Sequence, residues 1–215
     1  SSFKPLENYI PEKDATVITR MKQAGAIIIG KTNMPMLALD IQSDSPLFGR
    51  TNNPWDITRT PGGSTGGGAA SIAAGFSPLE IGSDIGGSVR IPAAMCGLAG
   101  FKPTVGRVPT EGIFPLSTTL DSVGPLAPSL ACCALVDAVF AGEDPNPRPQ
   151  VPLAGLRFGV PDTMVTDDLD PEVAAAFEKS LGLLSKAGVR IEDANVPGLD
   201  ELATVGRMRF PSQVE

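Results

Sequence analysis

Residues 62–88 have the sequence GGSTGGGAASIAAGFSPLEIGSDIGGS, in which two serines, Ser64 and Ser88, are each surrounded by glycine. Glycine adopts backbone conformations that other residues avoid, so several N–H groups can converge on one small volume and hold an oxyanion there. The chain contains no histidine. The absence of histidine excludes the Ser-His-Asp arrangement. If Ser64 or Ser88 is a nucleophile, it therefore needs a different base.

The composition is that of a globular protein without a nucleic-acid partner. The chain has 215 residues, of which 42% are apolar, enough for one well-buried core. Its formal net charge of −7 argues against binding a phosphate backbone. The three cysteines, Cys96, Cys132 and Cys133, lack the spacing of a disulfide framework or a zinc site. We therefore expect free thiols and a cytoplasmic protein, with no membrane segment in this chain.

The first part of the chain indicates a layered α/β domain. Asp14 is typical of a helix N-cap and Gly25 of the residue after a helix, which predicts a helix over 15–24. The β-branched run at 26–30, AIIIG, predicts a strand buried on both faces. Many turn formers follow, and they predict mostly irregular backbone over residues 31–61.

The middle of the chain continues with small and apolar elements. The pattern predicts a helix over 69–75, a strand over 77–84, and a strongly apolar helix over 129–141 that Ser129 caps. Residues 102–128 are dense in glycine, proline and threonine, and they predict an ordered connecting loop around short strands.

The last part of the chain has a βαβ rhythm. It predicts a strand over 156–161, a helix that opens at Asp170-Pro171 and runs to Lys186, and a further strand that begins near Val189. Two strands joined by a helix are expected to lie parallel in one sheet.

Phosphate binding is the first interpretation of the glycine segments, and the sequence fits it poorly. The Walker pattern places lysine and a hydroxyl residue after its second glycine, but no lysine lies between Lys31 and Lys102. The GxGxxG spacing of dinucleotide sites is also absent.

Serine hydrolysis is the second interpretation. Ser88 follows the turn formed by Asp84-Ile85-Gly86-Gly87, whose N–H groups can surround a developing oxyanion, and a predicted helix begins just after it. Ser88 is therefore the better nucleophile candidate, although a glycine-flanked serine is more often a structural turn residue. Because histidine is absent, the base must be Lys, Tyr, Asp or Glu. A desolvated lysine is the most easily tuned, and a second serine could pass the proton to it.

Four stretches resemble the amidase signature family over nearly the whole chain. They are AGAIIIGKTNMP at 24–35, PGGSTGGGAA at 61–70, DIGGSVRIPAAMCG at 84–97 and GFKPTVGRVP at 100–109. The resemblance implies a layered α/β/α domain on a mixed β-sheet. It also implies a single partial domain over 1–215 with a signature core over 1–144. The proline-rich composition near 145–152 predicts a surface linker over 145–155, and the βαβ rhythm predicts an extension of the same domain over 156–215.

The resemblance also implies an activity and a set of roles. Family members hydrolyse amide C–N bonds with a Ser, cis-Ser and Lys triad, in which Ser88 corresponds to the nucleophile and Ser64 to the serine on a cis peptide after Gly63. The oxyanion hole corresponds to the N–H groups of Ile85, Gly86, Gly87 and Ser88. Four residues correspond to supporting positions: Gly63, Thr65, Asp84 and Arg90. No cofactor and no metal is implied.

The chain departs from the family at the catalytic lysine. None of its seven lysines matches the lysine motif, which lies upstream of the segment that residues 1–14 resemble. We therefore expect a fragment that lacks this segment and the C-terminal portion and is inactive as such. A catalytically dead binding or scaffolding relative is one alternative.

The expected substrate is a small-molecule or acyl-chain amide. The alternative enzyme is the glutaminase subunit of a tRNA-dependent amidotransferase, a branch that usually has an acidic run where this chain has Pro35-Met36-Leu37. SPLFGRTNNPW at 45–55 is nearer to general and fatty-acid amide hydrolases, which favours hydrolysis into water. The sequence leaves the oligomeric state open, with a homodimer as one arrangement.

Overall fold

The computed structural model describes residues 2–146, 149–161, 166–199 and 201. Contacts divide the chain into two compact units, Ser1–Pro147 and Arg148–Val214. Residues 202–215 of the predicted βαβ extension lie outside the described residues.

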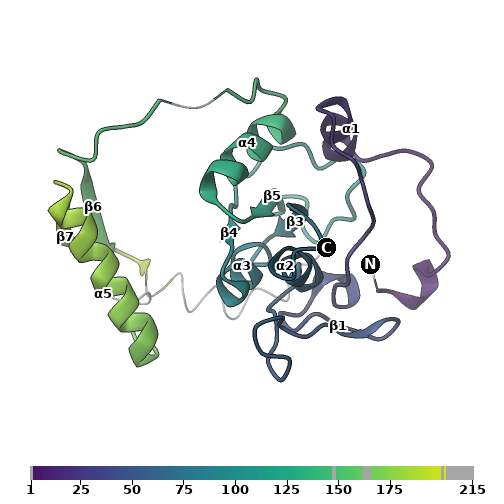
Figure 1. Ribbon diagram of the computed structural model, residues 1–215, viewed down its shortest axis with the longest axis horizontal. Helices are drawn as coiled ribbons and strands as arrows, with labels where there is room; N and C mark the ends of the chain where they lie inside the picture. The colour runs from purple at the N-terminus through teal and green to yellow at the C-terminus, as the bar shows by residue number, and fades with distance from the viewer. Residues whose placement is uncertain (1, 147–148, 162–165, 200, 202–215) are drawn as a thin grey trace. The chain divides into compact units, whose positions relative to one another are not determined.

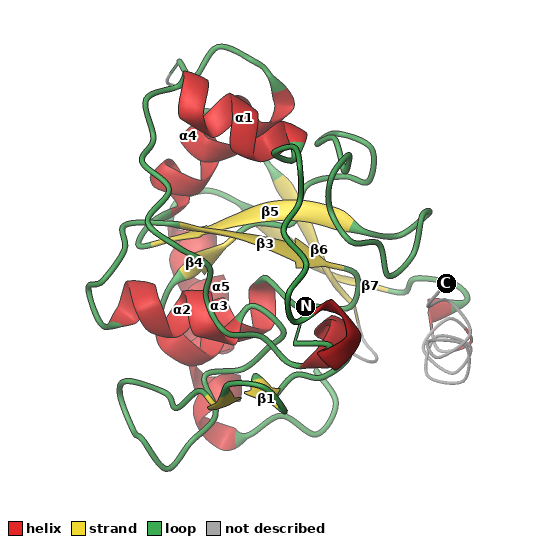
Figure 2. Ribbon diagram, turned by 90° about the vertical axis from the view of Figure 1, so that its right-hand side faces the viewer, coloured by secondary structure: helices red, strands yellow, loops and turns green. Residues whose placement is uncertain are grey.

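A three-stranded antiparallel sheet forms the centre of the first unit. Its order is β3-β5-β4, with β3 at Glu80–Asp84, β5 at Ser122–Ala127 and β4 at Ala99–Gly100. Helices α1 (Thr16–Gln23) and α4 (Leu130–Ala141) lie on one side of this sheet, and α2 (Gly66–Ala73) and α3 (Arg90–Cys96) lie on the other (Figure 2). The predicted α/β class with helices on both faces is therefore confirmed. The short elements are η1 (Lys4–Leu6), η2 (Met36–Ala38), β1 (Asp44–Ser45) and β2 (Gly49–Arg50).

Strand β5 separates two apolar cores. Its side chains alternate between faces, so Val123 packs with α1 and α4, whereas Leu126 packs with α2 and α3. All six residues of β5 are buried. The first core comprises Val17, Met21, Val108, Val123, Val136 and Phe140. The second comprises Ala69, Ile72, Val89, Ala93, Cys96 and Leu126.

Phe140 is the largest fully buried side chain of the first core, with 0% of its surface exposed. We expect Phe140→Ala to lower the free energy of unfolding by about 3–5 kcal/mol, because the lost burial and the remaining cavity both count. Phe48→Ala is the matched control, since Phe48 is 73% exposed, and it should change the value by less than about 0.5 kcal/mol. Denaturant unfolding of the whole protein measures both, and equal effects would contradict this core assignment.

The prediction of a helix over 15–24 is confirmed by α1, but its N-cap is Ala15 and not Asp14, whose carboxylate accepts a hydrogen bond from Lys22 at 2.6 Å. The helix ends as its glycine suggests: Gly25 has a φ of +91°, and the N–H of Ala26 donates to the Met21 carbonyl at 3.0 Å. The predicted helix over 69–75 is confirmed as α2, but it begins earlier, at Gly66. Ser129 caps α4 as predicted, by accepting the Cys132 N–H.

The prediction of a buried strand over residues 26–30 is wrong. This segment has no regular structure, and Ile27 and Ile29 are 87% and 72% exposed. A β-branched run becomes a strand when a neighbouring strand satisfies its backbone groups. No described strand pairs with this segment.

The short strands predicted within residues 102–128 had no bounds, and β5 could not be placed because its sequence SVGPLA contains glycine and proline, which favour loops. The packing explains the glycine: a Cβ on Gly124 would lie 2.0 Å from the Phe101 carbonyl oxygen. The central strand therefore needs a residue without a side chain at this point.

The second unit has the predicted βαβ order (Figure 1). Strand β6 (Arg157–Pro161) pairs with β7 (Arg190–Ala194) in parallel, and α5 (Pro171–Lys186) connects them in sequence. The Asp170 side chain caps α5 by accepting the Glu172 N–H at 2.9 Å. The predictions for these elements are confirmed.

Candidate active site

Two loops bring the predicted serines together. Ser64 follows a cis peptide bond after Gly63 and precedes α2, and Ser88 lies between β3 and α3. Helices α2 and α3 lie side by side on one face of the sheet (Figure 2). The N–H of Thr65, next to Ser64, donates to the Ser88 carbonyl at 3.1 Å, so the two loops are joined directly.

Both serines are buried but their hydroxyls are unengaged. Ser64 is 2% and Ser88 9% exposed. Neither hydroxyl hydrogen-bonds to another described residue. An unengaged hydroxyl in a buried turn is suited to nucleophilic attack once a base is supplied.

The glycine turn before Ser88 has a backbone conformation that favours glycine, since Gly87 has a φ of +128°. The N–H of Gly87 donates to the Asp84 carboxylate at 2.8 Å, so it is not available to a substrate oxygen in this structure. The N–H groups of Ile85, Gly86 and Ser88 donate to no described residue. Three of the four predicted oxyanion donors are thus unengaged in this structure, and the fourth, Gly87, is engaged by Asp84.

Asp84 and Arg90 brace this turn. The fully buried Asp84 carboxylate accepts the N–H groups of Gly87, Val89 and Arg90 at 2.8–3.3 Å. It also accepts two guanidinium hydrogen bonds from Arg90, at 3.1 and 3.0 Å. Burial raises the pKa of the Asp84 carboxyl, but the bonds from Arg90, Val89 and Gly87 outweigh it and hold the net pKa below its ordinary value.

The other supporting residues serve packing in this structure. A Cβ on Gly63 would lie 2.7 Å from the Ile41 carbonyl carbon, so the glycine allows the 40–41 backbone to approach Ser64. The Thr65 hydroxyl lies 2.6 Å from the position of a Cβ on Gly82, and it therefore faces β3.

Ser43 was missed by the sequence reasoning. It is fully buried, its hydroxyl donates to the Gly62 carbonyl at 2.9 Å, and it accepts the Gly66 N–H at 3.0 Å. Ser43 lies in the irregular segment before the glycines, and nothing in its local sequence separates it from an ordinary turn serine.

No described lysine is bonded to either serine. Lys102 donates to the Pro103 carbonyl at 2.9 Å, and Lys31 is exposed. Within the described ranges, no group of three or more His, Cys, Asp and Glu side chains is placed to hold a metal ion. None of the helices seen in the described part of the chain has the length and apolarity to cross a bilayer.

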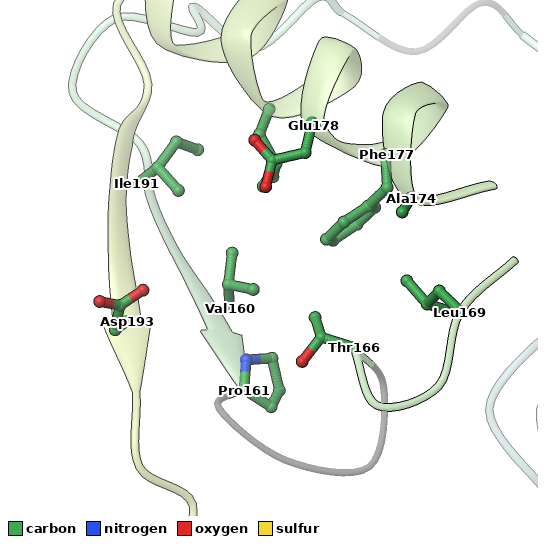
Figure 3. A pocket seen from close by; sticks show the side chains of 10 residues that line it. Val160, Pro161, Thr166, Leu169, Ala174, Phe177, Glu178, Ile191 and Asp193 are labelled. Atoms are coloured by element: carbon green, nitrogen blue, oxygen red, sulfur yellow. The ribbon is translucent and has the colours of Figure 1, made fainter. Parts of the chain in front are cut away.

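A cleft of about 330 Å³ lies in the second unit, between α5 and the β6–β7 pair (Figure 3). Its walls are mainly apolar, and the carboxylates of Glu178 and Asp193 also line it. It contains neither Ser64 nor Ser88, so it is separate from the candidate active site. The lining residues are Val160, Pro161, Thr166, Leu169, Ala174, Phe177, Glu178, Leu181, Ile191 and Asp193.

Comparisons with known proteins agree on one family. A family model described as Amidase matches residues 1–212. Among glutamyl-tRNA(Gln) amidotransferase A subunits, that of Roseiflexus sp. (strain RS-1) is 41% identical over 207 residues, which is 90% of this chain and 42% of that protein.

Solved structures show the same similarity. One of the glutamyl-tRNA(Gln) amidotransferase A subunits, from Thermotoga maritima, superposes with a TM-score of 0.89 at 33% identity, over 99% of this chain and 50% of that one. The native peptide amidase from Stenotrophomonas maltophilia gives 0.80 at 29% identity, over 94% and 45%. The chain thus spans half or less of the length of these relatives.

Proposed function

The chain belongs to the amidase family, and we propose that the whole protein hydrolyses an amide C–N bond with Ser88 as its nucleophile. The observation that carries this proposal is the hydrogen bond that joins the Ser64 loop to the Ser88 loop, from the Thr65 N–H to the Ser88 carbonyl. It sets an unengaged Ser88 hydroxyl beside three unused N–H groups and against the loop of Ser64.

The proposed reaction has two steps. Ser88 Oγ attacks the amide carbonyl, and the N–H groups of Ile85, Gly86 and Ser88 stabilise the oxyanion. The Ser88 proton passes through Ser64 to a neutral lysine, which the family resemblance supplies as the base, and then to the leaving nitrogen. The C–N bond breaks and ammonia or an amine departs. Water then cleaves the acyl ester, which yields a carboxylic acid and restores Ser88.

An apolar segment beside Ser64 supports an apolar substrate. The backbone of Asp40 and Ile41 lies against Gly63, the residue before Ser64. Met36, Leu39 and Ile41 are 45–48% exposed apolar side chains, and Asp40 is the one charged residue of the 36–41 segment. Side chains of this kind suit an acyl chain better than a charged amino acid.

We also place the protein in the cytoplasm, because its three cysteines are free.

A second candidate is the glutaminase subunit of an amidotransferase. Two similar proteins support it. The glutamyl-tRNA(Gln) amidotransferase A subunits of Roseiflexus sp. and Alkaliphilus metalliredigens are 41% and 39% identical to this chain. Such a subunit would act on glutamine and pass ammonia to a partner.

Ammonia release by the whole protein from linear aliphatic primary amides and from L-glutamine separates these candidates. We expect kcat/KM to rise roughly three- to fourfold for each added methylene, because each buried methylene contributes about 0.8 kcal/mol. Hydrolysis of glutamine with no dependence on chain length would favour the glutaminase. No turnover of any amide would favour a binding or scaffolding protein.

A further inference from the structure

The Ser43 hydroxyl binds both sides of the Ser64 loop. It donates to the Gly62 carbonyl at 2.9 Å, and the Ser64 carbonyl lies within reach of the same hydroxyl at 3.4 Å. Its oxygen accepts the Gly66 N–H at 3.0 Å. The buried Ser43 hydroxyl thus donates one hydrogen bond and accepts another, and both partners flank Ser64 in the sequence.

The surroundings hold Ser43 in place for these contacts. Its φ is +51°, in the left-handed region that non-glycine residues seldom adopt and that is retained where the surrounding structure requires it. The Ser43 carbonyl accepts the Thr51 N–H at 3.1 Å, which anchors its backbone. A Cβ on Gly66 would lie 2.2 Å from Ser43 Oγ, so the first glycine of α2 permits the close approach.

We infer that Ser43 is a positioning residue for the amide hydrolysis proposed above, and the inference rests on that function. By tying the backbone of Gly62, Ser64 and Gly66 to one hydroxyl, Ser43 fixes the backbone from which the Ser64 side chain projects. Ser43 transfers no proton and touches no substrate. Its contribution is the alignment of the relay, in which a displacement of about 1 Å can cost on the order of 100-fold in rate.

Ser45 provides a matched control. It is 3% exposed, close to the burial of Ser43, and lies two residues further along the chain. Its hydroxyl accepts the N–H groups of Leu47 and Phe48 at 3.1 and 3.0 Å, so it stabilises its own turn and makes no contact with the Ser64 loop. Loss of this hydroxyl removes a buried hydrogen-bonding group without affecting the relay.

Steady-state kinetics of the whole protein tests the inference with Ser43→Ala, Ser43→Gly and Ser45→Ala. We expect both Ser43 variants to lose about 10- to 100-fold in kcat with KM changed less than about threefold, because alignment affects the reaction more than substrate binding. Glycine tolerates the positive φ better than alanine, so Ser43→Gly should keep a higher thermal unfolding midpoint. Equal kcat losses at different midpoints would then trace the effect to the hydroxyl. Ser45→Ala should keep kcat within about twofold.

Several results would overturn the inference. They are a kcat for Ser43→Gly near that of the wild type, a rise in KM without loss of kcat, or a kcat loss in Ser45→Ala equal to that in Ser43→Ala. If Ser43→Ala fails to fold, Ser43→Gly carries the test. Ser88→Ala assayed in parallel separates the two proposals: a loss there with unchanged Ser43 variants removes only this inference, whereas wild-type turnover in Ser88→Ala removes the proposed function and this inference with it.

Discussion

Ser88→Ala is expected to lower kcat for amide hydrolysis by about 10⁴-fold or more, since loss of a nucleophile removes the acyl-enzyme route altogether. The variant should fold normally. Ser88 is buried beside a turn that Asp84 holds, and its hydroxyl has no partner among the described residues that would be left unpaired. Ammonia release by the whole protein, with thermal unfolding as the folding check, measures both effects.

Ser83→Ala is the matched control for this loss. Ser83 lies in β3, five residues before Ser88, and no described residue hydrogen-bonds to its hydroxyl. Its variant should keep kcat within about twofold. Turnover of Ser88→Ala within tenfold of the wild type would remove Ser88 from the nucleophile role.

Asp84→Asn is expected to lower the free energy of unfolding by about 3 kcal/mol at neutral pH. The carboxylate accepts three backbone N–H groups and two guanidinium bonds, and an amide cannot replace the charge that Arg90 and these donors face. This expected loss of unfolding free energy is at the lower end of the range for breaking a buried ion pair, because the Arg90 side chain is 52% exposed and can turn toward water. Denaturant unfolding measures this loss.

The pH dependence gives this prediction a definite sign. The pKa of Asp84 is lowered in the folded state, so its contribution is complete above the ordinary value of about 3.8 and is lost as the pH falls through the lower folded pKa. The difference between wild type and Asp84→Asn should therefore shrink below about pH 4. Asp44→Asn, at an exposed carboxylate, should change the free energy by less than about 0.5 kcal/mol. A difference that stays constant down to pH 2 would contradict this role for the Asp84 charge.

Sequence analysis predicted the helices and strands whose ends are marked by capping or turn residues next to them in the sequence. Helix α5 begins at Pro171 because Asp170 caps it, and both residues mark a helix start in any sequence. The failures came from elements that depend on distant partners. The apolar run at 26–30 lacks a described neighbour, and β5 is a strand because two cores cover it despite Gly124 and Pro125.

The candidate site divides in the same way. Ser64 and Ser88 were predicted because glycine and hydroxyl residues stand beside each other in the sequence. The use of the Gly87 N–H by Asp84 was not predictable, because composition does not show which N–H groups point inward. Ser43 was also missed, because its contacts are with residues 62–66 and arise only when the chain folds back on itself.

Covalent labelling of the whole protein tests the central claim most directly. A phosphonofluoridate, which esterifies nucleophilic serines, should abolish amide hydrolysis in proportion to the label incorporated. Trypsin with a glutamate-specific protease then separates the two serines, because cleavage after Arg59, Glu80 and Arg90 gives Thr60–Glu80 with Ser64 and Ile81–Arg90 with Ser88. Mass spectrometry should find one phosphonyl group on Ile81–Arg90, assigned by fragmentation to Ser88 and not to Ser83. Label on Thr60–Glu80, or inactivation with Ile81–Arg90 unmodified, would contradict the assignment of Ser88 as the nucleophile.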